Sequence, residues 1–370
     1  MKPLKKIFRI ILYALNVVLL ASLLLSAFSG YVSPQRFVFF SYLGLLFPFI
    51  LIGNIAVFIV WLLFKQWKLM LMSLAVFFIC IKAIYTYCPL HGRTDAIPKD
   101  AIKILTYNVM RFNNMKKDNP KGYPPNKILQ YIKETDADVV CIQEYGFAAG
   151  GANNITENDI MKALNKYPYH YFPRMQQPFR NEIYDVGFFS KFPILSFEKV
   201  PYESAYNESF AVELDIRGKR VTLINNHLES NKLTDEDRSS YYQLTKEPDT
   251  QSFDDFTQIM NKRLTPAFIT RADQADIISQ VIKENKNPYI IVCGDFNDTP
   301  ISYTRFKIKG DLNDAFVDSG FGLGITYNKY RFLFRIDYIL TGKNIKSYNC
   351  TVGKLNSSDH YPLWCYLQLK

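Results

Sequence analysis

The chain divides into a strongly apolar first part and a longer second part in which short apolar runs alternate with polar segments. Three apolar stretches fill the first part, over residues 7–29, 37–64 and 69–87. Each approaches or exceeds the ~18–20 residues that a helix needs to cross the apolar core of a bilayer. Aromatic residues such as Tyr31, Trp61 and Trp67 lie near their edges, as is common at membrane interfaces. The pattern predicts that residues 1–88 anchor the chain in the lipid bilayer through three transmembrane helices.

The second part begins after a short segment, residues 89–100, which is expected to be a linker. Beyond it, runs rich in β-branched and aromatic side chains predict strands. These runs are AIKILTYNV, ADVVCIQE, VGFFS, RVTLINNHL, YIIVCGDFN, RIDYILT and PLWCYLQL. Apolar residues recur at helical spacing in PNKILQYIKET and RADQADIISQVIKEN, which lie between strands. We therefore expect residues 101–370 to form one layered α/β domain.

Residues 229–270 interrupt this alternation with a polar, charged and weakly periodic segment. A segment of this length without regular structure in a compact domain is usually functional or disordered. A short helix is expected around SFDDFTQIMNKRL, residues 252–264. The sequence does not distinguish a functional lid from a flexible surface insertion.

The charge of the chain is distributed unevenly between the two parts. The formal net charge is +10, from 44 Lys and Arg against 34 Asp and Glu. Eight basic residues and no acidic residue lie before residue 88, which leaves 36 basic against 34 acidic residues for the remainder. The eight are Lys2, Lys5, Lys6, Arg9, Arg36, Lys65, Lys68 and Lys82. A basic chain often binds nucleic acid, but this excess belongs to the flanks of apolar stretches and does not support that class.

The basic residues also indicate how the anchor lies in the membrane. Four of them lie before or at the start of the first apolar stretch and two lie between the second and third, whereas only Arg36 lies between the first and second. Basic flanks favour the cytoplasm, so after three crossings the second part is expected outside a bacterial inner membrane. The first stretch also resembles a signal peptide, with a basic start and SAFSG near its end. Its removal would leave two spans and the same location for the second part.

Six cysteines are spread along the chain without the short spacings of a metal finger or a redox motif. Cys141 and Cys293 lie inside apolar strand-like runs, where buried reduced thiols are expected. A disulfide between Cys350 and Cys365 is compatible with a location outside the cytoplasm, but their spacing does not establish one.

Polar residues recur at the ends of the predicted strands. They are Asn108, Glu144, His227, Asp295, Asn297, Asp337, Asp359 and His360. One Asp or Asn at a strand end is explained by turn chemistry, but the ends of several strands of one sheet meet at a common edge. Carboxylates, amides and imidazoles gathered there favour a site for a hard cation with acid and base groups around it.

These residues lie in LTYNV, IQE, NNHL, GDFND, RIDYIL and SSDHYPL, in that order. The ordered set resembles the motifs of the endonuclease/exonuclease/phosphatase superfamily. That group includes DNase I-like nucleases, apurinic endonucleases, neutral sphingomyelinases, deadenylases and inositol-polyphosphate phosphatases. The resemblance covers residues 101–370. It implies a four-layer α/β sandwich with two central mixed β-sheets flanked by helices, preceded here by the anchor of three transmembrane helices.

The resemblance also implies which residues hold the metal and the substrate. Glu144 would be the main ligand of Mg²⁺, for which Mn²⁺ is a substitute. Asn108 and Asp359 would complete the metal shell, partly through water, since Mg²⁺ retains several waters around few carboxylates. Arg180 and Asn181 fall where family members often place residues that contact the substrate.

Five further residues would carry the chemistry. By the same resemblance, Asp295 would orient or deprotonate the attacking water, assisted by the amide of Asn297. His360, held by Asp337, would contact the phosphoryl group, and His227 matches a position near the phosphate. A carboxylate can act as the base in such a hydrolysis, while a metal and cationic imidazoles neutralise the charge that develops on the phosphoryl oxygens.

The resemblance leaves the substrate open between a lipid head group, a small phosphodiester and a nucleic acid. Inositol-polyphosphate phosphatases typically carry a Cys-Asp-Arg element where this chain has SSDHYPL, which disfavours that branch. Apurinic endonucleases share the pattern of RIDYIL and SDHYP, but their chromosomal substrate lies across the membrane from the expected location. We expect a membrane-anchored phosphoesterase dependent on Mg²⁺, and its location slightly favours lipid or small phosphodiesters.

Two alternatives stand beside this expectation. The first is an endonuclease or exonuclease acting on DNA or RNA, and the second is a catalytically silent binding module in the membrane. The presence of every motif residue argues against the silent module. No feature of the sequence predicts a protein partner.

Overall fold

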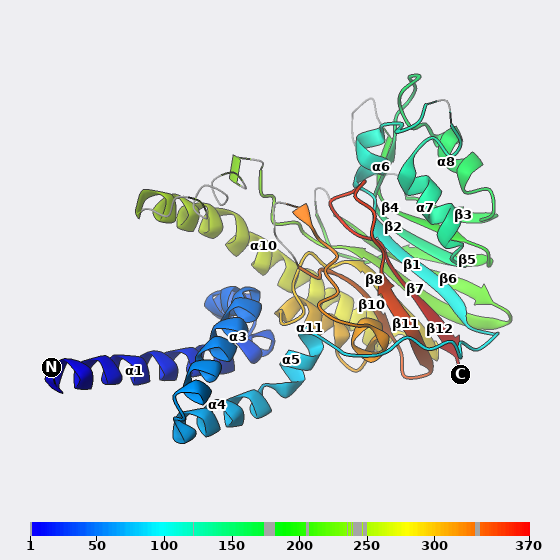
Figure 1. Cartoon of the computed structure of the whole chain (residues 1–370). Helices are drawn as coiled ribbons and strands as arrows, with labels where there is room; N and C mark the ends of the chain where they lie inside the picture. The colour runs from blue at the N-terminus through cyan, green and yellow to red at the C-terminus, as the bar shows by residue number, and fades with distance from the viewer. Residues whose placement is uncertain are drawn as a thin grey trace.

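Two six-stranded sheets face each other in the second part of the chain (Figure 1). The structure is a computed structural model that describes all residues except 1, 121, 174–181, 205–206, 235, 238, 240–245, 247–249 and 330–333. The first sheet has the strand order β11-β12-β1-β2-β4-β3, and the second has the order β5-β6-β7-β8-β10-β9. Only the pairs β1–β2 and β7–β8 are parallel, so both sheets are mixed.

The first sheet consists of β1 (Ile102–Asn108), β2 (Val139–Phe147), β3 (Tyr169–Tyr171), β4 (Glu182–Ser190), β11 (Ile345–Val352) and β12 (Leu363–Leu369). The second consists of β5 (Ile194–Lys199), β6 (Ser209–Ile216), β7 (Lys219–His227), β8 (Tyr289–Asp295), β9 (Asn313–Asp314) and β10 (Asp337–Thr341). All seven predicted strands are present. The apolar runs of the sequence do not predict β3, β5, β6, β9 or β11.

The apolar faces of the two sheets meet in a common core. Ile104 and Phe188 of the first sheet pack there with Leu223 and Ile339 of the second. Because the strands next to this core are also covered on their other faces, β1, β2, β7 and β8 are buried almost throughout. That two-sided burial explains their nearly continuous apolar runs.

Helices cover the outer faces of both sheets and complete four layers. The first sheet packs against α7 (Lys127–Thr135) and α8 (Glu157–Ala163), and the second against α10 (Thr250–Glu284) and α11 (Tyr303–Lys309). Two short segments, α6 (Met110–Met115) and α12 (Ala315–Ser319), complete the domain. The α/β sandwich expected from the sequence is therefore confirmed.

The charged insertion forms part of a long helix. The short helix expected over residues 252–264 is continuous with the one expected over RADQADIISQVIKEN, and together they make the 35-residue α10. Its C-terminal half packs on the second sheet through Ala275 and Ile278, whereas its N-terminal half extends away from that sheet (Figure 1). The expectation of a mostly irregular segment was therefore wrong for residues 250–270.

The apolar first part is helical. It contains α1 (Lys2–Ala27), η1 (Ser29–Tyr31), α2 (Pro34–Phe37), α3 (Phe39–Leu63), α4 (Trp67–Ile79) and α5 (Ile81–Tyr87). Within the described residues, the segments Ile10–Ala27 and Phe39–Leu63 are long and apolar enough to cross a membrane, and α4 with α5 makes a third candidate that is bent by 65°. The third predicted span is thus a bent pair of helices.

Polar contacts join the apolar helices to one another. The indole of Trp61 donates to Asn16 Oδ1 at 2.9 Å, and the amide of Asn54 donates to the carbonyl of Leu19 at 3.0 Å. Both contacts link α1 to α3. An unpaired amide inside an apolar helix is costly. The contacts with Trp61 and with the carbonyl of Leu19 therefore explain why Asn16 and Asn54 are tolerated inside these apolar helices.

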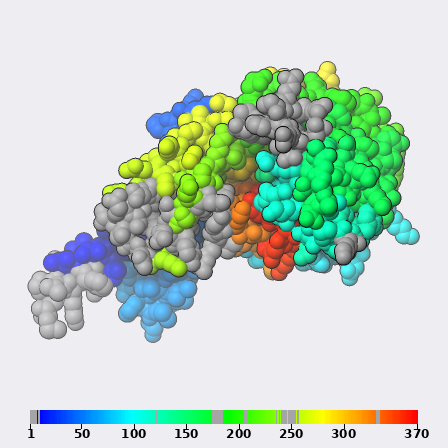
Figure 2. All heavy atoms as spheres, turned by 90° about the horizontal axis from the view of Figure 1, so that it is seen from above, coloured from blue at the N-terminus to red at the C-terminus, as the bar shows by residue number. Residues whose placement is uncertain are grey.

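The helices also pack directly on the α/β domain. Ser29 Oγ donates to the carbonyl of Ile301 at 2.9 Å, and the Tyr42 hydroxyl lies 2.8 Å from Thr265 Oγ1 on α10. The guanidinium of Arg335 donates to the carbonyl of Thr86 at the end of α5. In Figure 2 the yellow-green atoms of α10 lie between the blue atoms of the anchor and the green and cyan atoms of the domain. The anchor is therefore held against the domain at several points.

The cysteines are free thiols throughout the chain. Cys141 and Cys293 lie buried between the two sheets, as expected. Cys350 and Cys365 are also buried and unlinked, so the structure does not contain the disulfide that the sequence left open.

The junction between anchor and domain generates a prediction at Gly44. A methyl group there would lie 2.6 Å from Ser29 Oγ and 2.8 Å from the carbonyl of Ile301, whereas at Gly53 of the same helix the nearest atom would be 4.0 Å away. We expect Gly44→Ala to destabilise the full chain by about 1–3 kcal/mol through overpacking and Gly53→Ala to have no such effect. Thermal unfolding in detergent measures both, and equal melting temperatures for the two variants would contradict this packing.

Candidate active site

Strand register brings three of the predicted residues into one row of the second sheet. His227 at the end of β7 pairs with Asp295 at the end of β8, and Asp295 pairs with Asp337 at the start of β10. Cross-strand partners point to the same face of a sheet. The row is buried, since all three residues are no more than 5% exposed.

The ends of two parallel strands supply the facing residues of the first sheet. Asn108 at the end of β1 pairs with Gln143 of β2, and Glu144 follows directly. Glu144 has a φ of 51° and is the one residue of β2 that is not fully buried. A positive φ is uncommon for a residue other than glycine. It interrupts the β2–β4 ladder between the pairs Gln143–Val186 and Tyr145–Tyr184.

Asn108 connects the two sheets. Its side-chain nitrogen donates to Glu144 Oε1 at 3.1 Å and to Asp295 Oδ2 at 3.1 Å. Its side-chain oxygen accepts from the backbone of Met110 at 3.1 Å. Both amide donors are therefore directed at carboxylates that come from different sheets.

A buried polar pair fixes the sheets directly beside these carboxylates. Gln143 Nε2 donates to Asn225 Oδ1 at 2.5 Å, and Asn225 Nδ2 donates to the carbonyl of Ile142 at 3.0 Å. Gly294, with a φ of 121°, lets β8 approach β7, because a Cβ there would lie 2.0 Å from the carbonyl oxygen of Asn226. Only glycine adopts this conformation readily.

His360 lies between two carboxylates. Its Nδ1 is 2.9 Å from Asp337 Oδ2, and its Nε2 is 3.5 Å from Asp295 Oδ2. Burial lowers the pKa of His360, but the charges of Asp337 and Asp295 outweigh it and raise that pKa well above its usual value. The imidazole is therefore cationic at neutral pH, and the predicted Asp337–His360 pair is present.

The surroundings of Asp295 make its carboxylate more basic than usual. Burial raises its pKa to about 6, which leaves it ionised at neutral pH but more basic than an ordinary carboxylate. Its Oδ1 accepts from the backbone of Asn297 at 2.8 Å, and the Asn297 side chain donates to the carbonyl of Leu228 at 2.9 Å. Asn297 itself has a φ of 51°, which turns the chain around the carboxylate.

Asp185 of β4 joins the site and was missed by the sequence analysis. Its Oδ1 lies 2.5 Å from His227 Nδ1, while Asn207 lies 3.2 Å from His227 Nε2. Burial lowers the pKa of His227, but Asp185 outweighs it and raises that pKa to about 9. The signal available in the sequence was an acidic residue inside the apolar run IYDVGFFS, where an unpaired charge is costly.

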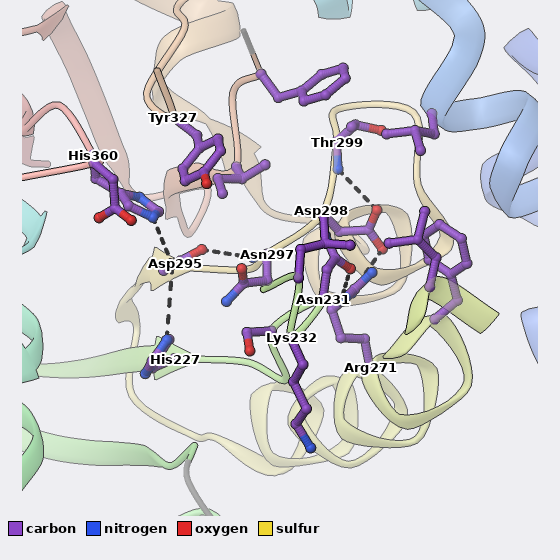
Figure 3. A pocket seen from close by; sticks show the side chains of 18 of the residues that line it. His227, Asn231, Lys232, Arg271, Asp295, Asn297, Asp298, Thr299, Tyr327 and His360 are labelled. Carbon is purple, nitrogen blue, oxygen red and sulfur yellow. Dashed lines mark hydrogen bonds and ion pairs between the residues drawn. The ribbon is translucent and has the colours of Figure 1, made fainter. Parts of the chain in front are cut away.

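A cavity of about 520 Å³ opens over these residues. Its polar end is lined by Glu144, Asp295, Asn297, Asp359, His227 and His360. Figure 3 shows His227, Asp295 and His360 on one side of the cavity and Arg271, Asp298 and Thr299 on the other. Asp359 is thus brought to the same cavity as the other predicted residues, whereas Asn108 and Asp337 lie behind it. Arg180 and Asn181 lie outside the described residues.

The donor atoms fit a hard divalent cation at the polar end of the cavity. Glu144, Asp295 and Asp359 offer carboxylate oxygens there, which Mg²⁺ prefers. Asp295, Asp337 and His360 also lie close enough to hold an ion, with ligand atoms within 4.8 Å of one another. In this second group, however, both nitrogens of His360 face the carboxylates of Asp337 and Asp295. The positive charge of the imidazolium already neutralises negative charge on these carboxylates. The side-chain nitrogen of Asn108 faces the carboxylates. Asn108 can bind a cation there only if its side-chain amide rotates so that the oxygen takes the place of the nitrogen.

Comparisons with known proteins agree on the family. A family model described as endonuclease/exonuclease/phosphatase matches residues 105–360. A second, for a domain of unknown function, matches residues 6–87. No curated protein matches the chain.

A solved structure of this family shares the fold at low identity. A family protein from Leptotrichia buccalis is 18% identical with a TM-score of 0.50 and covers 72% of this chain and 100% of its own. One from Beutenbergia cavernae is 16% identical with a TM-score of 0.49 over 73% of this chain and 72% of that chain. The family model spans more than half of the chain and all the strand-end residues of the site. The chain is therefore a member of the endonuclease/exonuclease/phosphatase family.

Proposed function

We propose that this chain is a membrane-anchored hydrolase that cleaves a phosphodiester or phosphomonoester with a divalent cation, Mg²⁺ or in its place Mn²⁺. The observation that carries the proposal is the position of Asp295. It lies in reach of Asn108 from the first sheet, of His227 from the second and of His360 from the loop before β12. A base with a raised pKa beside two imidazoles suits the attack of water on an anionic phosphoryl group.

The residues divide the reaction between them. Asp295, ionised at neutral pH, takes a proton from the attacking water, and the Asn297 backbone holds its carboxylate in place. The water oxygen forms a new P–O bond, one ester P–O bond breaks, and the leaving oxygen receives a proton. His360 and His227 donate to the phosphoryl oxygens as cations, with Asp337 and Asp185 fixing their rings.

The cation would be held by Glu144 and Asp359, with Asn108 nearby. When bound, it would neutralise charge on the phosphoryl oxygens and stabilise the leaving group. Among the described residues, all three carboxylates of the polar end lie within the same cavity as both imidazoles. This arrangement, rather than an isolated motif, favours an active enzyme over a silent binding module.

We further propose that the domain of residues 101–370 lies outside a bacterial inner membrane. The turn η1 that follows α1, the start of α3 and the end of α5 all contact the domain, through Ser29, Tyr42 and Thr86. The opposite ends carry Lys2, Lys5, Lys6, Arg9, Lys65 and Lys68. Three crossings, with α4 and α5 as one bent span, are consistent with these contacts. Basic flanks then place the far side in the cytoplasm.

The first prediction of the proposed function concerns the base Asp295 and the metal ligand Glu144. With bis-p-nitrophenyl phosphate and Mg²⁺, we expect Asp295→Asn in the full chain to lower kcat by about 100- to 10,000-fold, because general-base catalysis contributes that much. We expect Glu144→Gln to raise the Mg²⁺ concentration for half-maximal activity at least about tenfold. Glu157→Gln, on the exposed start of α8, is the matched control. Unchanged metal dependence in Glu144→Gln would refute the ligand assignment.

The second prediction concerns Asp185. Asp185 stabilises the His227 cation and raises the pKa of His227 to about 9. Activity that needs this cation is therefore lost as the pH rises through that pKa. Asp185→Asn removes the stabilising charge, and the alkaline limb of the pH–kcat profile should move to lower pH. Asp136→Asn, whose partners are the surface residues Lys166 and Lys191, should keep the wild-type profile. An unmoved alkaline limb in Asp185→Asn would exclude this role for the pair.

The third prediction concerns topology. An alkaline phosphatase reporter, which is active only outside the cytoplasm, should be active when fused after Lys370. The same reporter fused after Gln66, between α3 and α4, should be inactive because the basic residues nearby face the cytoplasm. The reverse pattern would place the domain in the cytoplasm.

A further inference from the structure

The cavity over the active site changes character along its length. Its polar end contains the carboxylates and imidazoles, and Asn231, Lys232, Arg271 and Asp298 line the adjoining wall, whereas a further wall is apolar. Leu45, Leu46 and Phe49 of α3 and Met260, Leu264 and Phe268 of α10 line it there. Its volume, about 520 Å³, lies within the roughly 300–1,000 Å³ typical of pockets that enclose organic ligands. One continuous cavity thus joins a phosphoester-binding end to an apolar end.

The apolar end continues into the membrane-facing surface. Helix α3 is one of the two long candidate spans, and Leu46 and Phe49 on it remain 46% and 57% exposed. The opposite wall is buried, with Leu264 and Phe268 of α10 only 2% and 3% exposed. A molecule entering between the two helices from the bilayer would therefore meet apolar surface before it reached Asp295.

The two walls are fixed relative to each other. The ring of Tyr42 on α3 packs edge-on against Phe268 at 5.4 Å, and its hydroxyl lies 2.8 Å from Thr265 Oγ1. On the catalytic side, Arg271 ties α10 to the site, donating to the carbonyl of Glu229 at 2.8 Å and lying 3.4 Å from Asp298. The membrane helix is therefore a wall of the site and not only an anchor.

We propose that the substrate is a phosphoester lipid of the membrane, whose phosphate binds beside His227 and His360 and whose acyl chain lies between α3 and α10. This inference rests on the hydrolase activity proposed above and names its substrate class. Burial of an acyl chain against Leu46, Phe49 and Leu264 is favourable in proportion to the apolar area covered. A polyanionic nucleic acid or a small hydrophilic phosphodiester gains nothing comparable from this wall.

The chemistry is the hydrolysis already described, applied to the lipid. Water supplies the oxygen of the new P–O bond, one ester P–O bond of the lipid phosphate breaks, and the released alcohol takes a proton. No oxidant or further reactant is needed. The hydrophilic product leaves toward the aqueous side, and the apolar product returns to the bilayer.

A series of p-nitrophenyl alkyl phosphates tests the inference with the full chain in detergent. All members share the leaving group and differ only in an alkyl chain of two to eight carbons. We expect kcat/KM to rise at least about tenfold across the series, since each fully buried methylene contributes up to roughly threefold to fourfold. Hydrolysis of the series without chain-length dependence would overturn the lipid assignment alone. Absence of hydrolysis of every member of the series and of bis-p-nitrophenyl phosphate would overturn the proposed function itself.

Matched variants on α3 locate the acyl chain. Phe49 lines the cavity, whereas Ile52 lies one turn further on, is 64% exposed and is not among the lining residues. Phe49→Ala should reduce the chain-length dependence severalfold, and Ile52→Ala should retain the wild-type dependence. Equal dependence in both variants would place the chain elsewhere and contradict the proposed groove.

A labelling experiment provides a readout independent of turnover. The full chain is placed in phosphatidylglycerol vesicles that contain a phosphatidylcholine with a diazirine on its acyl chain. Irradiation should label the Met260–Phe268 segment of α10, which belongs to the α/β domain. Labelling confined to α1, α3 and α4 would show surrounding lipid only and would overturn the proposal. Cleavage of a single-stranded oligonucleotide with a higher kcat/KM than the longest alkyl phosphate would likewise replace the lipid by a nucleic acid.

Discussion

The site depends on one contact, in which the Asn108 amide donates to carboxylates from both sheets. The partly exposed Glu144 and the buried Asp295 carry like charges, and Coulomb repulsion beside a buried group is stronger than in water. The two N–H groups of Asn108, each 3.1 Å from a carboxylate oxygen, offset part of that repulsion. The neighbouring Gln143–Asn225 pair prevents the sheets from relaxing apart. The remaining negative charge suits the site to a cation and to two imidazolium groups.

Much of the fold and most of the site could be predicted from the sequence. Strands buried on both faces are continuous apolar runs, and a polar residue at the end of such a run is conspicuous, as with Asn108 and Asp295. Asp185 was missed because it lies inside a run and not at its end. Its partner, His227, is 42 residues away in the sequence. Strand register, which a single sequence does not reveal, brings the two together.

The association of anchor and domain could not be predicted for a related reason. Their length and apolar composition make α1 and α3 candidate membrane spans, but the sequence says nothing about which of their residues contact the domain. The N-terminal half of α10 is polar in sequence, so its pattern does not indicate a buried face. Only its position beside α3 shows that Leu264 and Phe268 form a wall of the cavity. Tertiary contact, and not local propensity, decides that role.

The close fit at Gly44 has a consequence for how such a protein can change. Ser29 and Tyr42 fix the anchor to residues near the cavity, at Ile301 and Thr265. Two segments joined by a flexible tether can be exchanged independently, since neither carries information about the other. Here the membrane segment and the domain share an interface, so substitutions on one restrict those accepted on the other. A different α/β domain joined to these helices would lack the matching contacts, and the cavity between α3 and α10 would not form.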